Sequence, residues 1–368
     1  MRWTKFPVRL SFIAGALIAF SIATASAVAA QTVDAPQRIP FQIGTGSSTG
    51  TYFPVGNLLS EILSHPPGIA RCEASNVCGP PGLIVSTMAS QGSVSNVTSV
   101  TGGMINSGLA QADVVSLAAE GKGPFRKSGP SKGLRVIADL YGEDVHLVAA
   151  TKSKIEDVAQ LRGKRVSLSP EGSGTIVTAR AILSAYGIPE KSIHPNFDSP
   201  EDAVDLLRKG KLDALFLVGG TPINLVQDLL ADGTAHLVPI SGPGLRRLLH
   251  ADPWLEPHTI PKSAYSSSPA VETVSVDALW IADENQPERL IYGILKALYN
   301  PANRPSLQAS REGLHFLDAS FGPKLTPAPL HPGALRYFRE AGLIKPESKA
   351  EPAREPAREP ARARARKT

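Results

Sequence analysis

The sequence lacks the patterns that identify several common enzyme classes. Its first glycine-rich stretch, which begins at Gly44, is not followed by Gly-Lys-Ser/Thr, and its G-x-G-x-x-G spacing is broken. A nucleotide-binding loop is therefore excluded there. The eight histidines show no H-E-x-x-H or comparable spacing, so we expect no bound metal and no cofactor. Beyond the N-terminus, no apolar run is long enough to cross a membrane.

The central part of the chain also lacks excess charge. The formal net charge is +5, but residues 1–30 contribute +3 and residues after Pro346 contribute another +3, seven basic against four acidic. Subtracting both segments leaves about −1 for the rest of the chain. The basic sequence pI of 9.1 is thus no argument for binding nucleic acid, and we expect none.

The N-terminus is expected to be a secretory signal peptide over residues 1–30. Arg2, Lys5 and Arg9 precede an apolar run over residues 10–23, and small residues around Ala29 offer a cleavage site. The run is short for a membrane span, which leaves an uncleaved anchor as the alternative. The protein is therefore expected to be exported, to the periplasm.

Cysteine is scarce, with only Cys72 and Cys78 in the chain. In an exported protein, two cysteines that flank one short polar loop predict a disulfide bond. A metal site would need further ligands nearby, and the neighbouring sequence shows none.

The loop after the first expected strand is unusually rich in glycine and hydroxyl groups. Residues 39–43 form an apolar run of strand length, residues 44–50 form a turn, and helical spacing begins after Pro54. Such a loop leaves backbone N–H groups free at the positive end of a helix, which suits an anionic or strongly polar group. The hydroxyl-bearing residues are Thr45, Ser47, Ser48, Thr49 and Thr51.

Two other interpretations of this loop remain open. Residues 46–50 also match G-x-S-x-G, the nucleophile elbow of a serine hydrolase, with Ser48 as the nucleophile. However, this is the first strand of the mature chain, and no oxyanion-hole loop precedes it. Alternatively, the glycines only permit a tight turn, although that leaves the hydroxyl groups unexplained.

The same arrangement recurs along the chain. Polar turns over residues 90–96 and 169–175 each lead into a helix, and Gly219-Gly220 follows another apolar strand. Alternating strands and helices predict an α/β fold with mainly parallel sheets. Further strands are expected at 83–88, 134–140, 146–150, 165–169, 212–218, 236–240 and 273–281. A short helix is expected over 155–161, and residues 241–268 are expected to be rich in loops with a short helix around 245–249. His331 is expected at the start of the last helix.

From residue 346 to residue 368 the composition changes. The tetrapeptide Glu-Pro-Ala-Arg occurs three times, beginning at Glu351, Glu355 and Glu359. This proline-spaced, charged segment has too little apolar surface to fold, so we expect a disordered, solvated tail.

Several segments together resemble the TAXI family of TRAP-transporter solute-binding proteins. They are IGTGSSTGTYFPVG, SQGSVSN, GLAQADV, LRVIADLYGEDVHLV, LRGKRVSLSPEGSGTIVTARAIL, LDALFLVGGTP and HPGALRYFREAGL. The resemblance spans about residues 38–345, in the order of the family. It implies a periplasmic receptor that is not an enzyme and that delivers a small carboxylate or an amino acid such as glutamate to TRAP membrane subunits. We expect it to be a monomer. The alternatives are the binding protein of an ABC importer, or an exported serine hydrolase using Ser48.

The resemblance also implies the two-lobed, type II periplasmic-binding-protein fold, with a ligand cleft between the lobes. Lobe I is expected to hold residues 36–143 plus 272–345, and lobe II residues 148–268. Polar loops at the carboxyl ends of strands, where open α/β sheets bind ligands, supply the candidate ligand-binding residues. They are Thr45, Gly46, Ser47, Thr51, Tyr52, Gln91, Ser93, Asn96, Gln111, Ser173, Gly174, Thr175, Gly219 and Gly220. The recurring loops contain no Arg or Lys, so backbone N–H groups after Gly46 and Gly174 are expected to hold an anion.

Overall fold

The computed structural model describes residues 37–309 and 326–344. The expected signal peptide, the expected tail and residues 310–325 lie outside this range. Among the described residues, no helix combines the length and the apolar character that crossing a membrane requires.

Ten strands form one sheet in the described residues. Eight of them lie in the order β2-β1-β3-β10-β4-β7-β5-β6. Two more short pairings extend it, β8 with β4 and β9 with β10. The strands are β1 (Ile39–Gly44), β2 (Leu83–Met88), β3 (Ser107–Gln111), β4 (Leu134–Ala150), β5 (Arg165–Ser167), β6 (His194–Asn196), β7 (Ala214–Gly219), β8 (Ala235–Leu237), β9 (Leu255–Ile260) and β10 (Val271–Asp283).

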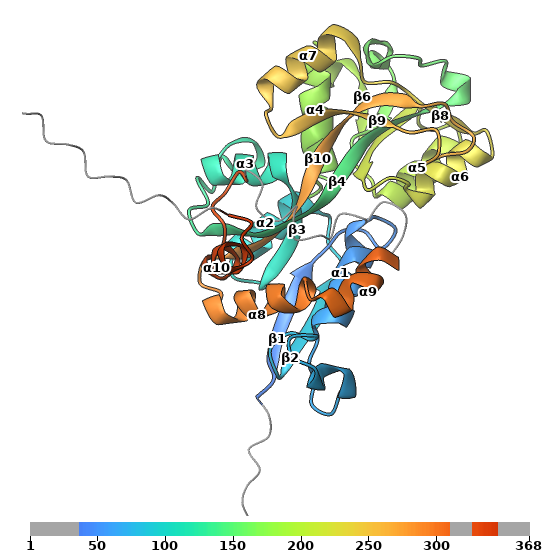
Figure 1. Ribbon diagram of the computed structural model, residues 1–368. Helices are drawn as coiled ribbons and strands as arrows, with labels where there is room; N and C mark the ends of the chain where they lie inside the picture. Colours follow the sequence, from blue (N-terminus) through green and yellow to red (C-terminus); the bar gives the residue numbers. More distant parts are fainter. Residues whose placement is uncertain (1–36, 310–325, 345–368) are drawn as a thin grey trace, which may run out of the picture. The chain divides into compact units, whose positions relative to one another are not determined.

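The sheet contains two groups of parallel strands. β2, β1 and β3 form one group, and β7, β5 and β6 form the other. Between them run β4 and β10, an antiparallel pair that lies side by side along most of its length (Figure 1). The predicted α/β fold is confirmed, and both parallel groups present the carboxyl ends of their strands to the loops predicted to bind a ligand.

Helices follow most strands of both groups. The α-helices of the described residues are α1 (Tyr52–Leu63), α2 (Ser93–Thr101), α3 (Ala112–Glu120), α4 (Thr175–Ala185), α5 (Pro200–Arg208), α6 (Asn224–Ala231), α7 (Gly242–Ala251), α8 (Glu288–Leu298), α9 (Arg304–Ala309) and α10 (Pro332–Glu340). Pro54 lies in the first turn of α1, where its missing N–H leaves no helical bond unmade. His331 caps α10 by accepting a hydrogen bond from the Gly333 N–H (3.1 Å), which matches its predicted place at a helix start.

Three sequence predictions about the central region were wrong. The two separate strands expected at 134–140 and 146–150 are one 17-residue strand, β4, because the intervening residues pair with β10 and β7. The stretch 241–268 contains the expected short helix as the longer α7, but it also contains an unexpected strand, β9, which carries Pro257 at the edge of the sheet, where proline is tolerated. The helix expected over 155–161 is a short 3-10 turn, Val158–Leu161.

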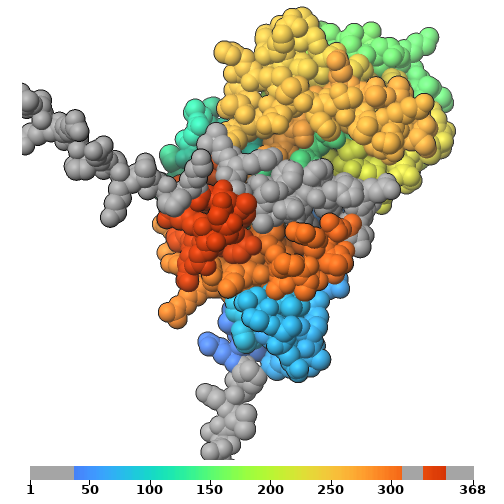
Figure 2. Space-filling view, in the orientation of Figure 1, coloured from blue at the N-terminus to red at the C-terminus, as the bar shows by residue number. Residues whose placement is uncertain are grey.

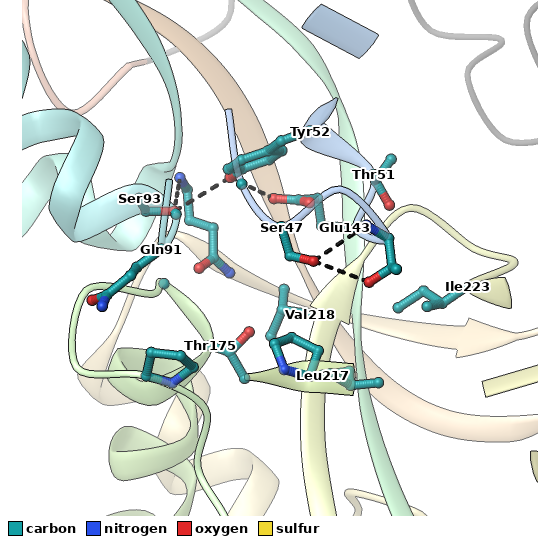
Figure 3. Close-up of a pocket in the computed structure, with 18 of the residues that line it drawn as sticks. Ser47, Thr51, Tyr52, Gln91, Ser93, Glu143, Thr175, Leu217, Val218 and Ile223 are labelled. Carbon is teal, nitrogen blue, oxygen red and sulfur yellow. Dashed lines mark hydrogen bonds between the residues drawn. The ribbon is translucent and has the colours of Figure 1, made fainter. Parts of the chain in front are cut away.

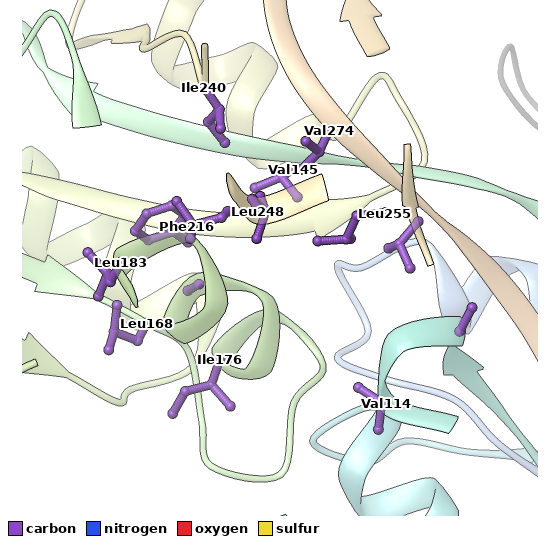
Figure 4. Close-up of a cluster of buried hydrophobic side chains, with 14 of the residues drawn as sticks. Val114, Val145, Leu168, Ile176, Leu183, Phe216, Ile240, Leu248, Leu255 and Val274 are labelled. Atoms are coloured by element: carbon purple, nitrogen blue, oxygen red, sulfur yellow. The ribbon is translucent and has the colours of Figure 1, made fainter. Parts of the chain in front are cut away.

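Buried apolar side chains pack the helices onto the sheet. In Figure 4, Ile176 and Leu183 of α4 and Leu248 of α7 gather near Phe216 of β7 and Val145 of β4. On the other parallel group, Phe41 of β1 packs edge-to-face against Trp280 of β10, with ring centroids 6.3 Å apart. Burial of these faces, and not local propensity, stabilises helices of this length.

The segment around the two cysteines lies against the C-terminal helices. Cys72 and Cys78 form a disulfide, as predicted, with their Cα atoms 5.2 Å apart. Asn300 donates a hydrogen bond to the Asn76 carbonyl (3.1 Å), and Asn303 donates one to the Val77 carbonyl (2.7 Å). The orange surface that includes α8 and α9 borders the blue surface of this segment in Figure 2.

Candidate functional site

One pocket collects the polar loops that follow β1, β2 and β5. Its empty volume is about 700 Å³, part of which is open solvent. Loops from the carboxyl ends of two parallel groups meet here, the position at which open α/β sheets bind ligands. The lining residues are Gly46, Ser47, Thr49, Gly50, Thr51, Tyr52, Gln91, Gly92, Ser93, Gln111, Glu143, Pro170, Gly174, Thr175, Pro200, Leu217, Val218, Ile223 and Leu225.

The loop after β1 is bonded to the opposite side of the pocket. The Thr51 hydroxyl accepts a hydrogen bond from the Gly220 N–H (3.0 Å). The hydroxyls of Ser47 and Thr49 both donate to the carboxylate of Glu201, on α5. These contacts join the β1–α1 loop to the loops of the second parallel group.

The floor of the pocket contains a buried Tyr52–Glu143 pair. The Tyr52 hydroxyl, on α1, donates to Glu143 Oε2 on β4 (2.9 Å) and lies 3.4 Å from Ser93 Oγ. Glu143 is 2% exposed. In Figure 3 this pair and Ser93 lie on one side of the pocket, and Thr175, Leu217 and Val218 lie on the facing side.

Gln111 lies where the loop of Ser93 approaches the loop of Gly174. Its backbone N–H donates to Ser93 Oγ (3.1 Å), and its side chain passes so close to Gly174 that an added Cβ there would lie 1.5 Å from Gln111 Oε1. Glycine is therefore required at residue 174 by close approach of Gln111. The Gln111 Nε2 group is buried and has no hydrogen-bond partner within the described ranges.

The second side of the pocket is largely apolar. Leu217 and Val218 come from the end of β7, and Ile223 and Leu225 from the start of α6. The pocket thus presents hydroxyl, amide and carboxyl groups from one side and aliphatic carbon from the other.

Nine of the fourteen predicted binding residues line this pocket. The nine are Gly46, Ser47, Thr51, Tyr52, Gln91, Ser93, Gln111, Gly174 and Thr175. The role of each in binding stays a prediction, but the structure brings together residues that lie up to 129 positions apart, from Gly46 to Thr175.

The other five lie just behind the lining, where their polar groups bond to the protein. Thr45 Oγ1 donates to the Met88 carbonyl (2.8 Å), and Asn96 Nδ2 donates to the Thr45 carbonyl (2.6 Å). Ser173 Oγ accepts from the Ile176 N–H (3.2 Å) and so supports the first turn of α4. Gly219 and Gly220 pack against Thr51.

Sequence reasoning missed Glu143 and the aliphatic wall. Glu143 lies inside a strand, between Gly142 and Asp144, and its pair with Tyr52 spans 91 positions. The one available signal was the acidic pair Glu143-Asp144 within an otherwise apolar run, because buried carboxyl groups need a reason. Leu217 and Val218 look the same in sequence as ordinary core residues.

The electrostatics of the pocket are acidic. Burial, opposed by the Tyr52 hydrogen bond and reinforced by the nearby Asp113, Asp144 and Asp277, raises the pKa of Glu143 to about 8. Burial also raises the pKa of Tyr52 well above its usual value. None of the described residues that line the pocket is Arg, Lys or His.

The neighbouring carboxylate, Asp144, is engaged elsewhere. Its Oδ1 lies 2.6 Å from His258 Nδ1, and its Oδ2 accepts from the Thr221 hydroxyl (2.6 Å). Behind it, His146 Nε2 lies 2.9 Å from the Tyr265 hydroxyl, and burial lowers the pKa of His146 to about 4. This cluster ties β4 to β9 and to the loop after β7.

Ser48, the nucleophile of the hydrolase alternative, is exposed and does not line the pocket.

The chain belongs to the NMT1-like family, whose model matches residues 43–342. Three solved structures of other proteins are distantly similar to this chain in fold. MatC from Rhodopseudomonas palustris with bound malate is 13% identical, with 74% of this chain and 89% of that chain covered and a TM-score of 0.47. The periplasmic aliphatic sulphonate binding protein SsuA from Escherichia coli is 16% identical (74% and 74% covered, TM-score 0.42). A candidate phosphate ABC transporter substrate-binding protein from Clostridium perfringens is 14% identical (74% and 98% covered, TM-score 0.42).

Proposed function

We propose that the chain captures a small polar organic solute in the pocket between the β1–α1 and β5–α4 loops and delivers it to the membrane subunits of a transporter. The observation that carries this proposal is the convergence of loops from both parallel groups on one pocket. A small carboxylate or an amino acid, glutamate included, is the solute class that the sequence predicts.

The loops offer donors for an acceptor group of the solute. The first turn of α4 leaves the Thr175 N–H without an intrahelical acceptor, and Thr175 lines the pocket. The hydroxyl of Thr175 and the amide of Gln91 add side-chain donors. A charge-assisted hydrogen bond contributes about 1.5–3 kcal/mol, so a few donors of this kind replace an ion pair.

We further propose that residues 36–143 plus 272–345 act as one lobe and residues 148–268 as the other. Two buried clusters follow this division, one with Phe41 and Ile291 and the other with Val204 and Val226, while a further cluster includes residues of both parts. The lobes would close on the solute by bending β4 and β10. The Thr51–Gly220 and Ser47–Glu201 contacts would then hold the closed form.

The proposed location is the periplasm, reached by the N-terminal signal peptide. Two membrane partners fit a receptor of this kind. The sequence resemblance favours TRAP subunits of the TAXI type, but the family match is to the NMT1-like family, and an ABC importer is the better supported partner. Adjacent genes encoding an ATPase and a permease would support the ABC importer, and a TRAP membrane-subunit gene pair would support the TAXI alternative.

Native mass spectrometry of the purified exported protein tests the function. We expect a co-purifying small organic solute that is absent from Gly174→Val, because the new side chain would displace Gln111 from its place in the pocket. Circular dichroism and the melting temperature of the ligand-free forms check that the variant folds. A wild-type protein that carries no solute and is stabilised by no compound of a small acid and amino-acid panel would contradict the proposal.

A further inference from the structure

The charge balance of the pocket is opposite to that of an anion site. Glu143 lines the pocket at 2% exposure, and Glu201 lies at its rim. No basic side chain is among the described lining residues. A solute whose only charge is negative would find no basic partner among these residues, whereas an ammonium group would gain an ion pair with Glu143 once that carboxyl group ionises.

Glu143 has unused capacity to accept hydrogen bonds. An ionised carboxylate offers about four acceptor sites. Within the described part of the chain, one side-chain donor reaches it, the Tyr52 hydroxyl at 2.9 Å. The carboxyl group therefore has room for an N–H group from within the pocket.

Gln111 supplies the complementary group. Its Nε2 is a donor without a partner in the described residues, on a side chain that is 2% exposed and lines the pocket. A buried unsatisfied donor costs about 1–3 kcal/mol, which a ligand oxygen would recover. Contact with Gly174 limits how far the amide can move.

The aliphatic wall selects the rest of the solute. Leu217 and Ile223 are 5% and 8% exposed and, with Val218 and Leu225, line the side of the pocket that carries no charged group. Such a surface stabilises an apolar body of a few carbon atoms and would leave a second carboxylate without partners.

Building on the proposed function, we propose that the solute is a zwitterion of the α-amino-acid class with an aliphatic side chain. Its protonated amine binds Glu143, its carboxylate binds Gln111 Nε2 and the α4 N-terminus, and its side chain packs on Leu217 and Ile223. Glu143 is thus the residue that selects an ammonium-bearing solute over a plain carboxylate.

The ionisation of Glu143 agrees with this assignment. Burial holds the pKa of Glu143 at about 8 in the empty pocket, so the carboxyl group binds a proton at neutral pH. The groups that surround it are acids, which cannot replace an ammonium group: Tyr52 on α1, Asp113 on α3, Tyr141 and Asp144 on β4, and Asp277 on β10. A bound ammonium group would favour the ionised form.

Three probes that share an isobutyl group test the inference. They are L-leucine, 4-methylpentanoate, which lacks the amine, and 3-methylbutylamine, which lacks the carboxylate. Calorimetry on the full exported chain, freed of co-purified solute, should show L-leucine binding about 100-fold more tightly than 4-methylpentanoate. The amine should bind with intermediate affinity. Equal affinities for L-leucine and 4-methylpentanoate would overturn the inference.

Glu143→Gln provides the second arm, because it keeps the shape of the side chain. It should weaken L-leucine binding about 50-fold and change 4-methylpentanoate binding less than about threefold. A variant that binds L-leucine as tightly as the wild type does would show that Glu143 does not select the amine. The melting temperature of the ligand-free variant reports its folding.

Failure of the inference and failure of the proposed function give different results. A co-purified solute without an amine, in a protein that binds none of the three probes, overturns the inference and leaves the function standing. No co-purified solute and no binding to any probe or panel compound overturns both. A co-purified aliphatic amino acid supports both.

Discussion

Glu143 and Asp144 are adjacent buried carboxylates on β4 with opposite surroundings. Asp144 lies between two donors, His258 Nδ1 and the Thr221 hydroxyl, each at 2.6 Å. Glu143 has the Tyr52 hydroxyl, a cavity and a set of acidic neighbours. Because successive side chains of a strand point to opposite faces, one residue joins the strands and the other lines the pocket.

The difference separates a structural carboxylate from a binding carboxylate. A buried charge is tolerated when the fold supplies its partners, as it does for Asp144. Glu143 is buried without a basic partner in the described residues, so its desolvation is not offset within the fold. In a receptor, the offset comes from the solute.

Asp144→Asn is expected to give the largest loss of stability. Asparagine would turn an N–H toward one of two donors, which should lower the free energy of unfolding by about 2 kcal/mol. Glu143→Gln should leave it unchanged or slightly higher, because it removes a desolvated acid. Urea unfolding of the two ligand-free variants measures both values. Equal destabilisation by the two changes would contradict the distinction.

The pH dependence of stability should come from Glu143 and not from its neighbour. Its pKa of about 8 lies above the value of an unfolded glutamate, so the folded state keeps a proton that the unfolded state has lost. Stability therefore falls as pH rises, and between pH 6.5 and 8 the loss due to Glu143 is about 2 kcal/mol. Asp113, with a pKa of about 7, adds a smaller loss in the same direction.

His146 acts weakly in the opposite direction. Its pKa is lowered to about 4, while an unfolded histidine with a pKa of about 6.5 still binds part of a proton at pH 6.5, so its contribution to stability rises by about 0.4 kcal/mol between pH 6.5 and 8. Unfolding curves at pH 6.5 and pH 8 for the wild type, Glu143→Gln and Asp144→Asn isolate the effect. The decline should be smaller in Glu143→Gln alone. A decline of equal size in all three proteins would assign it to other groups.

Contacts across the pocket should have smaller effects on affinity. Thr51→Val removes the acceptor for the Gly220 N–H and should weaken solute binding about fivefold, or about 1 kcal/mol. Thr51→Ser keeps the hydroxyl and serves as the matched control. Calorimetry with the co-purified solute is the measurement, and identical losses in the two variants would show that the hydroxyl does not matter.

Glu201, a third carboxylate, should matter least. It is partly exposed and accepts from Ser47 and Thr49 at the rim, where water competes for the same bonds. Glu201→Gln should change affinity less than about twofold. A loss as large as that in Glu143→Gln would move the selective charge from the floor of the pocket to its rim.

The local features of the fold could be predicted from the sequence. The loops after β1 and β5 were predicted because glycine, hydroxyl residues and an adjacent helical pattern are close together in the chain. The continuity of β4 could not be predicted, since Gly142, Glu143 and Asp144 interrupt the apolar pattern, and only β10, His258 and Thr221 show how they are accommodated.

The same limit explains the candidate site. Residues such as Ser47 and Thr175 were found because their loops are recognisable locally. Glu143 depends on Tyr52 at a distance of 91 positions, and Leu217 becomes a wall only because the loops after β1 and β2 lie opposite it. An anion site was predicted because only the polar loops were recognised in the sequence. The buried carboxyl group of Glu143 between those loops was not.

Proton release on binding tests the role of Glu143 most directly. Calorimetric titration of the wild type with L-leucine at pH 7, in buffers of different ionisation enthalpy, gives the number of protons exchanged. A group with a pKa of about 8 is about nine-tenths protonated at pH 7, so ionisation by a bound ammonium group should release about 0.9 proton per solute. Binding without proton release, or with uptake, would contradict the account.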